Sequence, residues 1–188
     1  MFIQTEQTPN PQTLKFLPGR AVIKEGTAFY KNESEALDSP LAKKLFAVDG
    51  VNGVFFGTDF ITVTKNENLD WQILKPVILG EIMDYYNSVE DTILENSQTK
   101  QSELQNENLN DSDIVKQIKE LLDTRVRPAV AMDGGDIVYK SFEKGIVYLH
   151  MQGSCAGCPS STATLKMGIE NMLKHYIPEV KEVQPIDA

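Results

Sequence analysis

The sequence has little cysteine and little histidine, and this scarcity limits its chemistry. Its 188 residues contain two cysteines and two histidines. A fold held by several disulfides is therefore excluded, as is a metal site of four cysteines within one chain. Both cysteines fall in one short segment, which reads Gly153-Ser154-Cys155-Ala156-Gly157-Cys158-Pro159-Ser160-Ser161.

Long apolar runs and an excess of positive charge are also absent. No stretch approaches the ~18 apolar residues that a membrane span needs. Residues 1–7 have neither the pattern of a secretory signal nor the arginine-rich composition of an organelle transit peptide. The net charge is −9 and no segment is basic, so neither a nucleic acid nor a membrane is an expected partner. We expect a soluble protein of a reducing compartment, where a Cys-x-x-Cys pair more often binds metal or does redox work than staples a fold.

The negative charge is uneven and indicates two domains. Residues 89–112 carry six acidic and one basic side chain, against net charges of −3 for residues 1–88 and −1 for residues 113–188. From residue 97 to 113 only Leu104 and Leu109 are apolar, so this stretch cannot bury enough apolar surface to offset the entropy of ordering. We predict a flexible acidic linker over residues 89–112, with a solvated helix as the alternative.

The N-terminal domain, residues 1–88, mixes strand and helix patterns without a recognisable nucleophile–base pair. Ser39 and Pro40 predict a helix start, as cap and first residue. Asp70 predicts another, although Pro76 can shift its true start. Runs of β-branched and aromatic residues predict strands over residues 2–8, 13–17, 51–56 and 60–64, the last two joined as a hairpin. The apolar face expected on the last helix comprises Ile73, Val77, Ile78, Ile82 and Tyr85.

The C-terminal domain, residues 113–188, predicts the order helix–strand–strand–helix–strand. Asp113 is the expected cap of the first helix, and Pro128 perturbs or ends it. The strands are expected over residues 137–142, 146–151 and 180–183. The apolar helical positions are Ile114, Ile118, Leu121 and Leu122 in the first helix, and Leu165, Ile169, Met172, Leu173 and Tyr176 in the second. The predicted fold class is α+β, as two small α+β domains.

The cysteine segment is predicted to be a turn between a strand and the amino end of a helix. The positive end of a helix dipole stabilises anions, so we expect lowered thiol pKa values for Cys155 and Cys158. Gly153 and Gly157 allow a tight backbone whose N–H groups can point toward sulfur.

The ligand count then favours a shared metal site. Tetrahedral zinc and iron–sulfur clusters usually take four protein ligands, and this chain offers two thiols. His150 precedes Cys155 by five positions and is interpreted as a structural or exposed strand residue. His175 would lie roughly 20 Å or more along the second helix. Two chains that share one centre across a two-fold axis would complete the site, and such an open site should be labile.

Three alternatives remain open for the cysteine pair. It can be a chance pair in which a cysteine serves as a small hydrophobe, although the Gly, Ser and Pro around it are poor core material. It can be a thiol–disulfide oxidoreductase motif, although Ser154 stands where the thioredoxin family has an aromatic residue. It can also link a structural zinc dimer.

Longer motifs resemble a known family. Residues 127–136 read Arg-Pro-Ala-Val-Ala-Met-Asp-Gly-Gly-Asp, and with the cysteine segment and Thr164-Leu165-Lys166-Met167-Gly168-Ile169-Glu170 they resemble the NifU-like C-terminal domain. Residues 8–19, 46–51, 53–57 and 59–65 resemble the domain that precedes it in Nfu-type proteins. Within the Asp-Gly-Gly-Asp run, we interpret Gly134-Gly135 as a helix-to-strand turn, and Asp133 and Asp136 as capping or turn residues rather than ligands.

The resemblance implies a function and a set of partners. It implies a non-enzymatic iron–sulfur cluster scaffold or carrier, whose cluster, commonly [4Fe–4S], bridges two subunits through Cys155 and Cys158. The implied partners are client apoproteins, upstream cluster assembly proteins and, when the cluster is bound, a second copy of the chain. The compartment expected first is a bacterial cytoplasm, and the second choice is the mitochondrial matrix.

Overall fold

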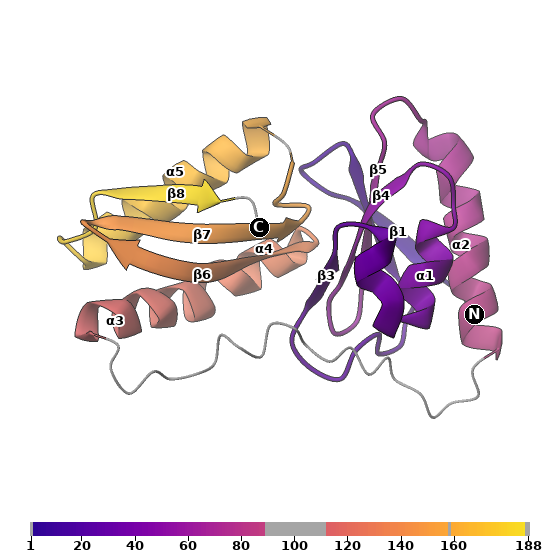
Figure 1. Ribbon diagram of the computed structural model, residues 1–188, viewed down its shortest axis with the longest axis horizontal. Helices are drawn as coiled ribbons and strands as arrows, with labels where there is room; N and C mark the ends of the chain where they lie inside the picture. The colour runs from indigo at the N-terminus through magenta and orange to yellow at the C-terminus, as the bar shows by residue number, and fades with distance from the viewer. Residues whose placement is uncertain (1, 89–111, 158, 187–188) are drawn as a thin grey trace. The chain divides into compact units, whose positions relative to one another are not determined.

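The structure, a computed structural model, describes residues 2–88, 112–157 and 159–186 (Figure 1). It divides into two compact units, residues 1–101 and 102–188. The predicted flexible linker over residues 89–112 lies outside the described residues, except for Ser112. Within the described parts of the chain, no helix is both long and apolar enough to cross a bilayer.

The N-terminal unit is a five-stranded antiparallel sheet with two α-helices and one 3₁₀ helix. The strand order is β1-β2-β5-β4-β3, and helices α1 and α2 share one apolar core with the sheet (Figure 1). The strands are β1 (Gln4–Gln7), β2 (Thr13–Leu17), β3 (Ala28–Tyr30), β4 (Val51–Phe56) and β5 (Ile61–Lys65). The helices are the 3₁₀ helix η1 (Glu33–Asp38), α1 (Pro40–Phe46) and α2 (Trp71–Ser88). The mixed α+β character predicted for this domain is confirmed, although β3 and η1 were not anticipated.

Helix α1 begins where its sequence predicts. Ser39 has an extended backbone, and its Oγ accepts a hydrogen bond of 3.0 Å from the N–H of Ala42. Pro40 follows as the first helical residue, where its missing N–H costs nothing.

Helix α2 buries three of the five residues predicted for its apolar face, Ile78, Ile82 and Tyr85. Ile73 and Val77 are 66% and 47% exposed, whereas Leu74 is buried. Leu74 stands four residues before Ile78, and so extends the stripe that Ile78, Ile82 and Tyr85 continue. The helix also runs from Trp71 with Pro76 inside it, so the proline does not delay its start. Two apolar stripes lie side by side in this segment, and only packing into the core of the unit selects one.

The C-terminal unit has the predicted element order. Its helices share one core with a sheet of order β6-β7-β8, in which β6 and β7 are antiparallel and β7 and β8 parallel (Figure 1). Its elements are α3 (Asp113–Leu121), the π-helical segment η3 (Leu122–Val126), α4 (Arg127–Met132), β6 (Gly135–Glu143), β7 (Ile146–Gly153), α5 (Pro159–Tyr176) and β8 (Glu182–Ile186).

Pro128 does not end the first helix of this unit. The chain passes from α3 through η3 into α4, and the N–H of Arg127 donates to the carbonyl of Leu122, five residues earlier. Proline has no N–H and its ring crowds the preceding turn, so a locally widened helix accommodates it. The hydroxyl of Thr124 also donates to the carbonyl of Glu120 at 2.7 Å within this stretch. Arg127 therefore lies where the π-helical segment η3 ends and the α-helix α4 begins.

Several predicted boundaries in this unit shift. The helix cap is Ser112, whose Oγ accepts from the N–H of Val115 at 3.4 Å, and not Asp113. The third strand is β8, Glu182–Ile186, rather than residues 180–183. Tyr176, expected on the buried face of α5, is 42% exposed. Strands β6 and β7 extend to pair Gly135 with Gly153, because cross-strand hydrogen bonds outweigh the weak strand propensity of glycine. These two paired ends border the cysteine segment.

Candidate metal centre

Cys155 lies in a tight turn that follows β7. Backbone hydrogen bonds join Ser154 N–H to the carbonyl of Gly134 (3.2 Å), Cys155 N–H to that of Gln152 (3.2 Å) and Ala156 N–H to that of Gly153 (3.1 Å). Gly153 and Gly157 have φ angles of 60° and 78°, so the predicted glycine-dependent turn is confirmed. The predicted N–H contacts to sulfur are not formed by these three groups, which donate to carbonyl oxygens. Cys158 lies outside the described residues.

A second turn, between α4 and β6, packs against the first. A Cβ atom placed on Gly135 would lie 2.5 Å from Sγ of Cys155 and 2.7 Å from the carbonyl oxygen of Gln152. Gly134 has φ of 82°, and its N–H donates to the carbonyl of Ala131. The helix-to-strand turn predicted for Gly134-Gly135 is confirmed. Its further consequence is that only glycine lets the backbone approach the sulfur this closely.

Cys155 is buried, and its thiol is not activated as predicted. It is 5% exposed and belongs to the hydrophobic core of the unit. Burial raises the pKa of Cys155 to about 12; a hydrogen bond with the side chain of Ser154 lowers it, and the charges of Asp136 and Asp133 raise it further. The expected lowering of this pKa by a helix dipole is wrong for Cys155, because burial is the largest cause and shifts the pKa upward. A thiolate at this position therefore needs a bound cation to offset its burial.

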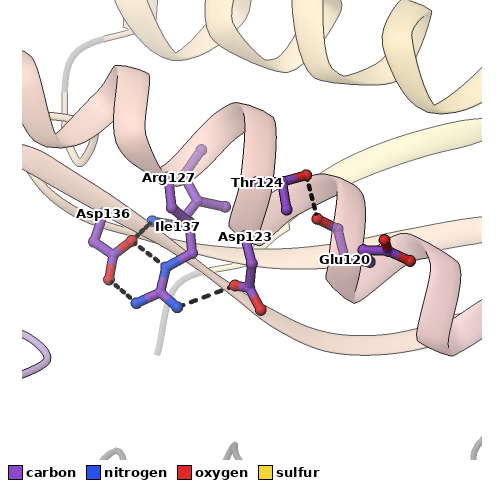
Figure 2. A network of polar contacts seen from close by, with 6 residues as sticks. All are labelled: Glu120, Asp123, Thr124, Arg127, Asp136 and Ile137. Carbon is purple, nitrogen blue, oxygen red and sulfur yellow. Dashed lines mark hydrogen bonds and ion pairs between the residues drawn. The ribbon is translucent and has the colours of Figure 1, made fainter.

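Asp133 is a capping residue, as predicted, whereas Asp136 lies in strand β6 and not in a cap or turn. Asp133 ends α4, with its N–H donated to the carbonyl of Ala131. Asp136 is almost fully buried and accepts two hydrogen bonds from Arg127, one from Nε to Oδ1 and one from Nη2 to Oδ2, each of 2.8 Å (Figure 2). The pKa of the Arg127 guanidinium is raised, first by this hydrogen-bonded pairing. Asp136 is thus occupied by an arginine.

Neither histidine is seen beside Cys155 as a further metal ligand in the contacts of the described residues. His150 is 5% exposed on β7, and its Nδ1 lies 3.2 Å from Nε2 of Gln152. His175 meets the ring of Tyr176 at the end of α5, with ring centroids 5.0 Å apart. Over the described ranges, no group of three or more histidine, cysteine and acidic residues is arranged to hold a metal ion.

The contacts of two residues around the site are not predictable from the sequence. Arg127 belongs to the motif over residues 127–136, and its pairing with Asp136 joins residues on two different elements. Gly135 was interpreted as a turn residue, with no contact to sulfur. Both residues belong to the motif over residues 127–136, which is the feature of the sequence that could have pointed to them. Spacing along the chain does not show which atoms they contact.

The described residues fit an iron–sulfur group. A cysteine sulfur is the ligand that iron prefers in such clusters. Gly135 removes the side chain that would crowd this sulfur, and the surrounding core lowers the access of water. The hydroxyl of Thr162, in the first turn of α5, donates to the carbonyl of Cys155 at 3.2 Å and ties the turn to the helix.

Two family models match this chain. Residues 3–89 match the family model described as "Scaffold protein Nfu/NifU N terminal", and residues 118–184 match the "NifU-like domain". A solution structure of a NifU-like protein from Saccharomyces cerevisiae is 30% identical, with a TM-score of 0.44, and covers 50% of this chain and 84% of that one.

Two curated relatives extend the match over nearly the whole chain. The human "NFU1 iron-sulfur cluster scaffold homolog, mitochondrial" is 54% identical over 99% of this chain and 72% of its own length. The "NifU-like protein 4, mitochondrial" of Arabidopsis thaliana is 54% identical over 98% of this chain and 65% of its own length. The chain thus spans about two thirds of that plant relative. From these matches, the chain belongs to the family of Nfu-type iron–sulfur cluster scaffold proteins.

Proposed function

We propose that the chain is a non-catalytic carrier that binds an iron–sulfur cluster through Cys155 and Cys158 and transfers it to apoproteins. The observation that carries the proposal is the close approach of Gly135 to the sulfur of Cys155. Because glycine has no side chain, only backbone atoms lie on this side of the thiol. The family assignment supplies the class of cargo. The cluster is cargo in this proposal, and the protein holds it, shields it and releases it.

We further propose that two chains share one [4Fe–4S] cluster. One chain has two cysteines, whereas such a cluster usually takes four cysteine ligands. A second copy supplies the missing pair across a two-fold axis. Each chain contributes few ligands, so thiols of a client can replace them one at a time. Lability is therefore a direct consequence of the ligand count.

Anaerobic reconstitution with iron and sulfide tests the cargo and the sharing together. A shared [4Fe–4S] cluster gives about two irons and two sulfides per chain, a shared [2Fe–2S] cluster about one, and an unshared [4Fe–4S] cluster about four. Sedimentation should show a dimer after loading. Cys155→Ser or Cys158→Ser alone should abolish the brown colour, whereas His175→Ala, at the end of α5, should keep it. A full cluster in the double cysteine variant would falsify the proposal.

The chemistry of Cys155 argues against this residue as the attacking thiol of an oxidoreductase. An attacking thiol must be ionised and accessible, and Cys155 is neither at neutral pH when metal is absent. Turnover on insulin at the rate of an established oxidoreductase would restore that alternative. Tightly held zinc without labile sulfide, in protein purified anaerobically, would instead favour the structural dimer.

The remaining assignments extend the same proposal. The domains are residues 1–88 and 113–188, joined by the acidic segment 89–112, with the N-terminal domain selecting clients or assembly proteins. The compartment proposed is the mitochondrial matrix, since the relatives named above are mitochondrial; a bacterial cytoplasm, expected first from the sequence, has no support among them. Pull-down with the full chain, compared with a chain that lacks residues 1–88, would test partner selection.

A further inference from the structure

The side chains of Arg127 and Asp136 meet across the turn between α4 and β6. Nε and Nη2 of the guanidinium donate to Oδ1 and Oδ2 of the carboxylate, at 2.8 Å each (Figure 2). The Asp136 side chain is 4% exposed and the Arg127 side chain 35%. Two parallel charge-assisted bonds restrict direction as well as distance. The first residue of α4 is thereby joined to the second residue of β6.

Further bonds hold both partners of the pair in place. The N–H of Ile137 donates to Oδ1 of Asp136 at 2.8 Å, so the carboxylate is oriented by its own strand. On the other side, Nη1 of Arg127 donates to Oδ1 of Asp123 at 3.1 Å, and the Asp123 side chain is 60% exposed. The buried bonds to Asp136 are expected to outweigh this exposed bond.

The residues just before Asp136 are those that touch the cysteine turn. Gly135 lies against Sγ of Cys155, and the carbonyl of Gly134 accepts the N–H of Ser154. Asp136 itself pairs in register with Gln152, whose carbonyl accepts the N–H of Cys155. A displacement of the start of β6 would therefore be passed to Cys155 by contact and by hydrogen bond.

We propose that the Arg127–Asp136 pair is a positioning element of the cluster site. It holds the start of β6 against Cys155, and so limits how often the thiol becomes exposed and how fast a bound cluster is lost. The second effect rests on the proposed function, whereas the first concerns the metal-free chain alone. The competing interpretation is a pair that only adds to the global stability of the domain.

Alkylation of Cys155 in the metal-free, full-length Cys158→Ser protein separates these interpretations, because it leaves a single thiol. Arg127→Met should raise the alkylation rate under native conditions by about tenfold or more, through local opening of the turn. Arg127→Lys keeps the charge but loses the two-pronged geometry, and should have an intermediate effect. The matched control is Asp123→Asn, which removes only the charge of the exposed ion pair and should stay within about twofold of its parent.

Cluster loss gives the second readout. In chains that retain both cysteines and are loaded anaerobically, Arg127→Met should speed transfer of iron to a chelator by about 10- to 100-fold, with Asp123→Asn close to wild type. Arg127→Lys and Asp136→Asn provide the same comparison if Arg127→Met does not fold.

The outcomes distinguish the two proposals. Alkylation that rises only in proportion to global unfolding, measured by urea titration of the same variants, would overturn the positioning role. So would an equal effect of Asp123→Asn. If wild-type chain loads and releases a cluster but the variants behave alike, this inference fails and the proposed function stands. If no chain loads a cluster while alkylation responds as stated, the proposed function fails and the positioning role stands.

Discussion

Gly135 presents no side chain to the sulfur of Cys155, and a Cβ atom at Gly135 would lie 2.5 Å from Sγ. The same atom would approach the carbonyl oxygen of Gln152 to 2.7 Å and the nitrogen of Cys155 to 3.0 Å. Two of these three neighbours are backbone atoms, which cannot rotate away. The close approach of β6 to the cysteine turn therefore depends on glycine.

Gly135→Ala adds a single methyl group but should destabilise the C-terminal unit and impair cluster binding. We expect a loss of about 1–3 kcal/mol in the free energy of unfolding, from overpacking against backbone, and a reconstituted cluster content well below that of wild type. Urea unfolding and iron analysis measure the two effects.

The matched control for this variant is Gly168→Ala on α5, where an added Cβ meets nothing within 4 Å. That change should stabilise the helix by roughly 0.5–1 kcal/mol, because alanine has the higher helix propensity. If both alanine variants have the same stability and the same iron content, the backbone at Gly135 has room for a side chain beside Cys155.

The buried thiol of Cys155 predicts a stability that falls at high pH. Its pKa is raised from 9.0 to about 12, mainly by burial, so the folded metal-free chain holds this proton more tightly than the unfolded chain. The resulting stabilisation is complete below about pH 9 and is lost as the pH rises toward 12, at up to about 1.4 kcal/mol per pH unit.

Urea unfolding between pH 8 and about 10.5 tests this dependence in metal-free Cys158→Ser protein. The reference is the Cys155→Ala/Cys158→Ser double variant, which lacks the titrating thiol. Above pH 9, the free energy of unfolding of the Cys158→Ser protein should fall relative to that of the double variant. Parallel pH curves would show that Cys155 is not shielded in solution.

The Arg127–Asp136 pair predicts unequal costs for its two partners. Arg127→Met leaves a carboxylate whose side chain is 4% exposed without its counter-charge, and should cost about 3–5 kcal/mol. Asp136→Asn leaves a guanidinium that is 35% exposed and still bonded to Asp123, and should cost about 1–2 kcal/mol. Equal costs would mean that the carboxylate reaches water in solution. Arg127→Met combined with Asp136→Leu should recover much of the loss.

Two helix caps of the same residue type should differ in strength. Ser39 is fully buried and bonds the N–H of Ala42 at 3.0 Å, whereas Ser112 is exposed and its bond to Val115 is 3.4 Å long. Ser39→Ala should cost about 1–2 kcal/mol and Ser112→Ala about 0.5 kcal/mol. Hydrogen exchange of α1 and α3 in the full chain measures each unit separately. A larger effect at Ser112 would contradict the prediction.

Much of the architecture follows from local sequence. Ser39 and Pro40 start α1 because a cap and a preset φ angle act within a few residues. Lys144 and Gly145 close the β6–β7 hairpin in two residues, both with positive φ (54° and 88°), the conformation that favours a tight hairpin turn. Such features depend on neighbours along the chain, so their location could be predicted without the fold.

Other features depend on contacts between elements and were predicted wrongly or not at all. Ile73 and Leu74 are adjacent apolar residues, and only the packing of the other elements around α2 decides that Leu74 is the buried one. The helix dipole suggested an acidic thiol at Cys155, whereas burial among core residues reverses the direction of the pKa shift. Burial depends on what the other elements place around a group, and one segment of sequence does not contain that information.

The sequence by itself determined that one chain supplies two cysteine sulfurs and no third, because ligand number is a matter of composition. It also predicted a turn between a strand and a helix for this segment, which the structure confirms at Cys155. Only the tertiary structure decided that Cys155 is buried against Gly135, and that Arg127 is bonded to Asp136 at the next position along β6. The physical reason is that desolvation and two-pronged hydrogen bonding depend on distances across the fold, which residues distant in sequence acquire only when the sheet and helices pack.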